Sequence, residues 1–207
     1  MVMKRIIIIG SGFAGINCAK QLASSKYEVL IIDKTNHHLF QPLLYQVATA
    51  VLSPSDIAVP IRNIFKKNKN IKVILGNVVS IDKNKKKVTL KSNKIYDFDY
   101  LVICTGAKHS YFGNDEWEKH SNGLKTVDNA IEIREKILIA FEKAERENNP
   151  KTRQKHLNFV VVGGGPTGVE LAGSIAEIAY NNLSNDFRNF NTKEARIYLI
   201  EAGDKIL

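Results

Sequence analysis

The sequence predicts an α/β fold built from two similar parallel-sheet units, with a small antiparallel meander in the first. The main observation is a repeat, in which RIIIIGSGFAGINCAKQL at residues 5–22 is matched in kind by LNFVVVGGGPTGVELAGSI at residues 157–175. Each stretch is a β-branched apolar run, then closely spaced glycines, then a segment with helical periodicity. A continuously apolar strand is typical of a parallel sheet covered on both faces, so two such sheets are expected.

The first predicted unit alternates strands and helices. A helix is expected after the first glycines because Ile16, Ala19 and Leu22 recur at helical spacing. Residues 53–67 are expected to form a second helix because Ser and Asp at their start resemble an N-terminal cap. In chain order we expect a strand at 5–9, a helix at 13–24, a strand at 27–33, a loop at 35–46, a helix at 53–67, strands within 71–82, an antiparallel meander at 86–99 and a strand at 100–107.

The second predicted unit begins after a polar, glycine-containing stretch at 108–123, which marks the domain boundary. Apolar residues at helical spacing then predict a helix at 127–148. The repeated strand–glycine–helix pattern follows, then a loop at 184–195 and a last strand at 196–201. The two domains are therefore predicted at residues 1–112 and 113–207.

The composition sets broad limits on the class of protein. The 207 residues are 44% hydrophobic, which is enough for a packed core. No apolar run approaches the roughly 18 residues of a membrane span. The isoleucines near the start lead directly into glycines without a cleavage site, so we expect no signal peptide and a cytoplasmic chain. Cys18 and Cys104 do not form a Cys-x-x-Cys pair, so no metal site and no dithiol are predicted.

The formal net charge of +9 is concentrated in the first half of the chain. Residues 1–107 hold 16 Lys and Arg against 6 Asp and Glu, whereas residues 108–207 hold 14 against 15. A lysine-rich surface can attract anionic lipid or phosphates, but such lysines are also typical of solvated loops and edge strands. Aromatic residues are not interleaved with these lysines, which argues against a surface for single-stranded nucleic acid.

The first glycine cluster has the spacing of a phosphate-binding turn. Gly10 permits a tight turn, Gly12 lets the backbone approach a pyrophosphate, and Gly15 lets the following helix pack closely on the strand. The N-terminus of that helix offers free N–H groups and the positive end of its dipole to the anion. Asp33 ends the next strand, where a carboxylate can accept hydrogen bonds from both ribose hydroxyls of an adenosine. The pattern therefore predicts a Rossmann-like dinucleotide-binding unit.

The second glycine cluster, with Gly163, Gly165 and Gly168, repeats the spacing of a phosphate-binding turn. Glu201 ends the last strand, and it takes the ribose role that Asp33 has in the first unit. A carboxylate there repels a 2′-phosphate, so this site is expected to prefer NADH over NADPH.

Two phosphate cradles predict two dinucleotides held by one chain. The economical chemistry is hydride transfer from a nicotinamide to a flavin, because a flavin accepts two electrons and releases them singly. The predicted reacting groups are therefore a flavin and the nicotinamide of NADH.

These features together resemble the two-dinucleotide flavoproteins, which have a glutathione-reductase-like fold. That family shares a first glycine turn for FAD, a second for NAD(P)H and an apolar strand ending in Thr-Gly, here YLVICTGA at residues 100–107. More narrowly, the stretches TNHHLFQPLLYQVATAVLSPSDIAVPIR, FVVVGGGPTGVELAGSIAE, DEWEKHSNGLKTVDNAIEIREKIL and IEAGDKIL resemble type II NADH:quinone oxidoreductases, the single-subunit, non-proton-pumping respiratory dehydrogenases. The resemblance implies an FAD-binding domain at 1–112 and an incomplete NADH-binding domain at 113–207.

The resemblance also implies roles for individual residues. The FAD ribose would lie on Asp33, and the NADH ribose on Glu201. Glu170 would be the catalytic glutamate close to the nicotinamide and the flavin, although a carboxylate near a helix N-terminus is also favoured by the helix dipole alone. The implied cofactor-binding residues are Gly10, Gly12, Phe13, Ala14, Gly15, Asp33, Lys34, His38, Gln41, Pro42, Leu43, Val79, Thr105 and Gly106 for FAD, and Gly163, Gly165, Pro166, Thr167, Gly168 and Glu201 for NADH.

Partners and location follow from the same resemblance. NADH would deliver hydride to the flavin, and the reduced flavin would reduce a membrane quinone. Members of this family continue for roughly as long again, so the chain is expected to be an N-terminal half that is inactive alone. The quinone pocket and the membrane-binding helices would belong to the other half. The implied location is peripheral, on the cytoplasmic face of the inner membrane, with no nucleic-acid partner and with a homodimer left open.

Other functions stay open at this point. Disulfide reductases of the same superfamily carry a redox cysteine pair after the second strand, and NHHLFQPLLYQ contains no cysteine, which argues against that branch and against sulfide oxidation. A soluble NADH-dependent reductase of a ferredoxin or rubredoxin is compatible with the same motifs, and so is a flavin-binding signalling protein of low turnover. A nucleic-acid binder based on the lysine cluster has the least support.

Overall fold

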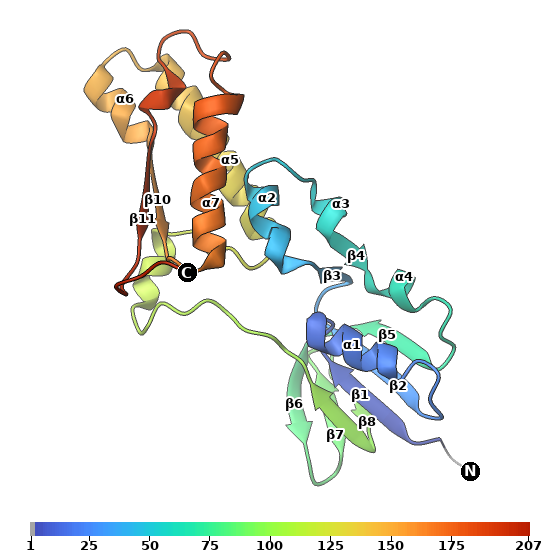
Figure 1. The fold of residues 1–207 in the computed structure, drawn as a ribbon. Helices are drawn as coiled ribbons and strands as arrows, with labels where there is room; N and C mark the ends of the chain where they lie inside the picture. Colours follow the sequence, from blue (N-terminus) through green and yellow to red (C-terminus); the bar gives the residue numbers. More distant parts are fainter. Residues whose placement is uncertain (1–2) are drawn as a thin grey trace. The chain divides into compact units, whose positions relative to one another are not determined.

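A computed structural model describes residues 3–207 and divides into two compact units. The first unit contains the chain up to Leu39 together with Ala58–Lys108, and the second contains Phe40–Ile57 and His109–Leu207. Figure 1 shows the elements of each unit along the chain. The assignment of FAD to residues 1–112 and of NADH to residues 113–207 stays a prediction.

The first unit is built on a four-stranded parallel sheet, as predicted. Its order is β5 (Ile71–Leu75), β2 (Glu28–Asp33), β1 (Arg5–Ile9) and β9 (Tyr100–Ile103). Alternate residues of β1 point to opposite faces, so that Ile6 and Ile8 join one buried cluster and Ile7 and Ile9 join the other. Both faces are therefore covered, which explains the continuous apolar run.

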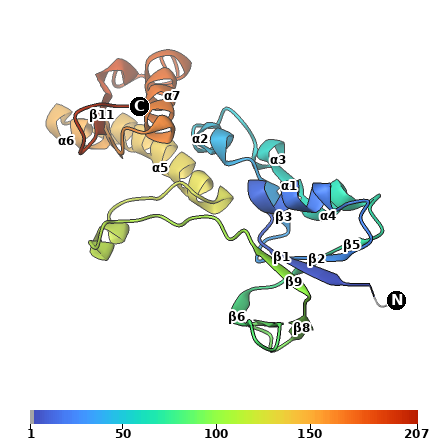
Figure 2. The same ribbon diagram turned by 60° about the horizontal axis from the view of Figure 1, so that its bottom comes forward.

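The two faces of this sheet have different covers (Figure 2). Helices α1 (Phe13–Gln21) and α4 (Ile61–Phe65) pack on the first face. The antiparallel meander of β6 (Val78–Asp82), β7 (Lys87–Leu90) and β8 (Ile95–Asp97) packs on the second through Val88 and Leu90. The meander predicted at 86–99 is thus present, but it begins earlier, because its first strand β6 lies within residues 71–82.

The single helix predicted at residues 53–67 is wrong. The segment forms a short helix α3 (Pro54–Ile57), a strand β4 (Ala58–Pro60) and the helix α4. Pro60 has no N–H to donate within a helix and disfavours helical geometry at the residue before it. Instead β4 pairs antiparallel with β3 (His37–Leu39), which lies in the predicted loop. The rest of that loop forms a 3₁₀ helix at Gln41–Leu43 and the helix α2 (Leu44–Ala48).

The second unit contains the second strand–glycine–helix repeat (Figure 1). Strands β10 (Asn158–Val162) and β11 (Arg196–Ile200) pair in parallel. Between them along the chain lies the helix α7 (Pro166–Glu177), which continues as a π-helix at Ile178–Asn182. The predicted long helix is present as α5 (Val127–Arg146), and a further helix, α6 (Pro150–His156), follows it. Short 3₁₀ helices lie at Asp115–Lys119 and Thr192–Glu194.

Aromatic side chains fill the core of the second unit. Phe141 of α5 is fully buried, and its ring stacks on Phe159 at 5.4 Å and on Phe187 at 6.0 Å between centroids. This core fixes α5 and α7 against one face of β10 and β11. Across residues 3–207, no helix combines the length and the apolar character needed to cross a membrane.

Candidate functional site

The first glycine turn connects β1 to α1 and has the backbone geometry that its sequence predicts. Gly10 has φ of +95°, a conformation that L side chains rarely adopt, and its N–H donates to the carbonyl of Ile32 at 2.8 Å. A Cβ added at Gly15 would overlap the carbonyl oxygen of Gly10, and one added at Gly10 would overlap the carbonyl oxygen of Cys104. Glycine at these two positions is therefore required by the close approach of three backbone segments.

Gly12, by contrast, is not required by contacts within the chain. A Cβ added there would meet no atom within 4 Å, and its φ of −66° is open to any residue. Gly12 is also the N-cap of α1, and as a glycine it has no side chain that could cap the helix. Exposed backbone at a helix N-terminus, with open space beside it, fits a pyrophosphate, so the first turn fits a dinucleotide.

Asp33 ends β2 beside this turn and already accepts four hydrogen bonds from the chain itself. Its Oδ2 accepts from the N–H and the hydroxyl of Ser11, both at 2.5 Å, and its Oδ1 accepts from the N–H and the hydroxyl of Thr35 at 2.7 and 2.8 Å. A carboxylate has about four acceptor positions. Ribose hydroxyls would therefore have to share or displace these donors, a condition that the sequence pattern did not reveal.

His38 of β3 approaches the same turn from the other side. Its Nδ1 lies 2.9 Å from the carbonyl oxygen of Ser11, and its ring meets the ring of Phe13 edge-on at 5.2 Å. Ser11 is only 2% exposed, so its peptide groups are inside the structure. His38 therefore contacts the backbone of the glycine turn, and its predicted contact with FAD stays a prediction.

The remaining predicted FAD residues lie in several places. Thr105 and Gly106 follow β9, next to the first turn, because the N–H of Cys104 donates to the carbonyl of Ile9 at 2.7 Å. Lys34 is exposed after β2, Val79 is 58% exposed on β6, and Phe13 and Ala14 begin α1. Three predicted residues belong to the second compact unit rather than the first: Gln41, Pro42 and Leu43.

The second glycine turn connects β10 to α7 and shares most features of the first. Gly163 has φ of +107° and donates its N–H to the carbonyl of Ile200 at 2.8 Å. A Cβ at Gly168 would overlap the carbonyl oxygen of Gly163, whereas one at Gly165 would meet no atom within 4 Å. Gly165 is the N-cap of α7, followed by Pro166 and Thr167 in the first turn. This turn therefore fits a dinucleotide phosphate as the first does.

Glu201 follows β11 and is held by three backbone N–H groups. Its Oε2 accepts from Gly164 at 2.5 Å, and its Oε1 accepts from Ala202 at 2.7 Å and Gly203 at 2.9 Å. These bonds, first of all that from Gly203, hold the pKa of Glu201 below its usual value. Because one acceptor position stays open, Glu201 has room for a ribose hydroxyl that Asp33 lacks.

Glu170, the predicted catalytic residue, is exposed on α7 two residues after Gly168. Within residues 3–207, its side chain makes no hydrogen bond or ion pair with the chain. The residues described by the structure also include no group of three His, Cys, Asp or Glu side chains that could hold a metal ion.

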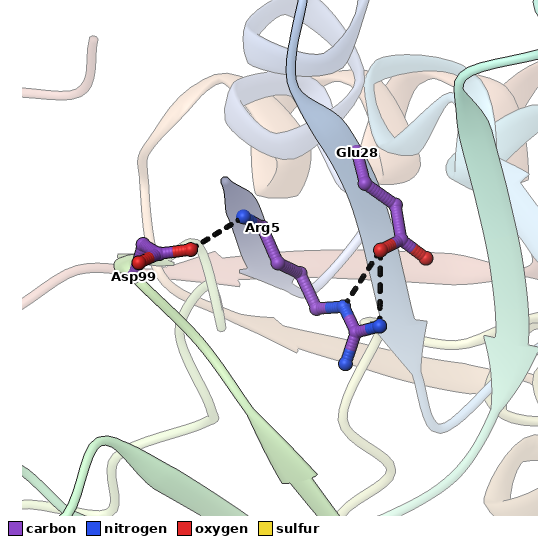
Figure 3. A network of polar contacts seen from close by, with 3 residues as sticks. All are labelled: Arg5, Glu28 and Asp99. Atoms are coloured by element: carbon purple, nitrogen blue, oxygen red, sulfur yellow. Dashed lines mark hydrogen bonds and ion pairs between the residues drawn. The ribbon is translucent and has the colours of Figure 1, made fainter. Parts of the chain in front are cut away.

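A separate polar network lies at the opposite, amino-terminal ends of the first-unit strands (Figure 3). The guanidinium of Arg5 contacts Oε2 of Glu28 through Nε at 3.0 Å and Nη2 at 2.9 Å, and the N–H of Arg5 donates to Oδ2 of Asp99 at 2.7 Å. These contacts join the starts of β1 and β2 to the residue before β9. The network lies at the end of β1 opposite to the glycine turn.

Comparisons with known proteins agree with this geometry. The family model for pyridine nucleotide-disulphide oxidoreductases matches residues 4–207. Two type II NADH:quinone oxidoreductases of Mycobacterium tuberculosis, Ndh and NdhA, are 46% and 47% identical to the chain over 206 residues. Each match covers 98% of this chain and 44% of the relative, so the chain spans less than half the length of these curated relatives.

A solved structure gives the same result for the fold. The structure of NDH2 from Plasmodium falciparum in complex with NADH has a TM-score of 0.90 and 30% sequence identity, covering 99% of this chain and 43% of that one. The predicted α/β class and the predicted resemblance to type II NADH:quinone oxidoreductases are both confirmed.

Proposed function

Because the chain belongs to the pyridine nucleotide-disulphide oxidoreductase family, we propose that it forms the FAD-binding and NADH-binding part of a type II NADH:quinone oxidoreductase. The observation that carries this proposal is the duplicated glycine turn. Gly12 and Gly165 each leave open space beside the backbone at a helix N-terminus. In each turn, a backbone N–H donates a hydrogen bond to a carboxylate at the end of the next strand. Two such cradles in one chain suit a resident dinucleotide and an exchanging one.

The first unit would hold FAD and the second would hold NADH. The first turn would bind the FAD pyrophosphate through its backbone N–H groups, with Asp33 and Lys34 at the ribose and adenosine. The second turn would bind the NADH phosphates, with Glu201 at the ribose and against a 2′-phosphate. A bound flavin would take up the two electrons of a hydride and pass them on singly. Glu170 is the exposed carboxylate assigned to the reacting rings.

The acceptor is proposed to be a membrane quinone. Both M. tuberculosis relatives are named as NADH:quinone oxidoreductases, and the chain shares nearly half of its residues with them. The quinone pocket and the membrane contacts are assigned to parts of such an enzyme outside these 207 residues. We further propose a peripheral location on the cytoplasmic face of the membrane, with a homodimer as the oligomeric state to test.

The proposal is tested by purifying the complete gene product and assaying it with two acceptors. We expect a yellow protein that retains FAD and oxidises NADH faster with a soluble quinone than with a ferredoxin. A protein that stays colourless after reconstitution with FAD would refute the cofactor assignment. A preference for ferredoxin would leave the cofactors standing and replace the quinone as acceptor. Sedimentation with vesicles and size-exclusion chromatography test the location and the oligomeric state.

A further inference from the structure

The peptide groups on both sides of Ser11 are fixed by hydrogen bonds from different elements. The N–H of Ser11 donates to Asp33 at the end of β2, and the carbonyl of Ser11 lies 2.9 Å from Nδ1 of His38 in β3. Ser11 is 2% exposed, so water does not compete freely for either group. The backbone between Gly10 and Gly12 is therefore held from two sides before any ligand arrives.

Fixing the carbonyl of Ser11 also fixes the N–H of Gly12. The two groups belong to one planar peptide, and in a trans peptide they point in opposite directions. Residues 3–207 contain no cis peptide bond. With the carbonyl of Ser11 directed at His38, the N–H of Gly12 is directed away from His38. Gly12 is the N-cap of α1 and borders open space, where a phosphate would be bound.

The second glycine turn supplies an internal comparison. Gly164 occupies the place of Ser11, since its N–H donates to Glu201 and its carbonyl accepts a hydrogen bond from the N–H of Leu207 at 2.9 Å. Both turns thus have a carboxylate on the N–H and a donor on the carbonyl. The donor in the second unit is a backbone amide, whereas in the first unit it is an imidazole.

We propose that His38 is a positioning residue for the first glycine turn, and that it acts through Nδ1 on the Ser11–Gly12 peptide rather than by contacting the dinucleotide. The Ser11 carbonyl can only accept, so the Nδ1 atom of His38 carries the proton. In the neutral ring, Nε2 is then left as an acceptor. This inference rests on the proposed binding of FAD at the first turn. It gives a histidine in β3 a role in orienting the backbone N–H groups that would bind the phosphates.

Three substitutions of His38 separate a role for Nδ1 from a role for Nε2. The side-chain amide of His38→Asn lies about where Nδ1 does, the amide of His38→Gln lies about where Nε2 does, and His38→Ala has neither. FAD affinity of the deflavinated complete gene product is measured by fluorescence titration. We expect His38→Ala and His38→Gln to raise the Kd about tenfold, the effect of losing one partly buried hydrogen bond. His38→Asn is expected to stay near the wild-type Kd.

The neighbouring histidine provides the matched control. His37 is also in β3, and its Nδ1 lies 3.2 Å from the side-chain oxygen of Asn36, in an exposed contact that does not involve the glycine turn. His37→Ala should therefore leave the Kd for FAD unchanged. The inference is overturned if His38→Gln binds like wild type while His38→Asn does not, if a folded His38→Asn binds as weakly as His38→Ala, or if all three variants bind like wild type.

A second measurement does not depend on any variant folding. The ¹⁵N chemical shifts of the His38 ring in the wild-type protein distinguish a proton on Nδ1 from one on Nε2. We expect the Nδ1-protonated form, and a neutral ring protonated on Nε2 overturns the inference. The failure of the proposed function looks different, because the wild-type protein would then bind no FAD while the ring shifts could still report the proton on Nδ1.

Discussion

The backbone N–H of Gly164 donates to Oε2 of Glu201 at 2.5 Å, and the N–H of Ser11 donates to Oδ2 of Asp33 at the same distance. In both units a carboxylate at the end of the second strand therefore anchors the middle of the glycine turn. Each carboxylate therefore has a structural role beside the ribose-binding role that is proposed for it. Substitutions of these carboxylates will alter the turn as well as any contact with a ribose.

Gly12 and Gly15 should respond to the same substitution in opposite ways. Gly15→Ala places a methyl group against the carbonyl of Gly10, so we expect a loss of about 2 kcal/mol in the free energy of unfolding. Gly12→Ala meets no atom of the chain, so the fold should be kept while the methyl group blocks the phosphate and the Kd for FAD rises at least about tenfold. Urea unfolding and the flavin content after purification measure the two effects. Equal loss of stability in both variants would contradict this reading of the turn.

The second turn offers the matched pair, with a different ligand. Gly165→Ala should raise the KM for NADH without loss of FAD, because its methyl group projects into open space at the N-terminus of α7. Gly168→Ala should destabilise the second unit, because its methyl group overlaps the carbonyl of Gly163. Steady-state kinetics and flavin absorbance on the same samples check the separation. A Gly165→Ala protein that loses FAD and keeps its KM for NADH would reverse the assignment of the two turns.

The sequence predicted the parts of this fold that depend on local spacing. The spacing of Gly10, Gly12 and Gly15 predicts the strand, turn and helix, because Gly10 and Gly15 are needed for close backbone contacts and Gly12 leaves open space at the helix N-terminus. The continuous isoleucine run of β1 likewise predicts a sheet covered on both faces.

The parts that the sequence did not predict depend on partners far away in the chain. Cap residues at 53–67 indicated one helix, but the pairing of β4 with β3 and the ring of Pro60 favour a strand there. The filled acceptor positions of Asp33 required the side chains of Ser11 and Thr35 to turn toward it, which no spacing rule specifies. The bond from His38 to Ser11 spans 27 residues and became visible only with the packing of β3.

The network around Arg5 should contribute little to stability despite its good geometry. The side chains of Arg5 and Glu28 are 37% and 31% exposed, so solvent screens the pair, and exposed ion pairs typically contribute less than about 1 kcal/mol. A double-mutant cycle with Arg5→Gln and Glu28→Gln, measured by urea unfolding, should give a coupling energy below about 1 kcal/mol that shrinks in high salt. A coupling several times larger, or one insensitive to salt, would mean that the strand ends are far less hydrated than the exposed fractions indicate.

The acid stability of the second unit should depend on Glu201. Backbone N–H groups of Gly203, Gly164 and Ala202 lower its pKa below the usual value of 4.5 in the folded state. A group with a lowered folded-state pKa contributes stability above its unfolded pKa and loses that contribution as the pH falls through the folded pKa. The wild-type protein should therefore exceed Glu201→Gln in free energy of unfolding by a constant amount above pH 4.5, and the difference should shrink at lower pH.

Asp204→Asn serves as the control for this comparison, because Asp204 is an exposed carboxylate in the same segment. It removes one charge near Glu201 without removing the bonds to the glycine turn. Its difference from wild type should stay small and should not collapse below pH 4.5 as that of Glu201→Gln does. If the two variants follow the same pH profile, the effect comes from net charge, and the three backbone bonds to Glu201 do not stabilise its ionised form.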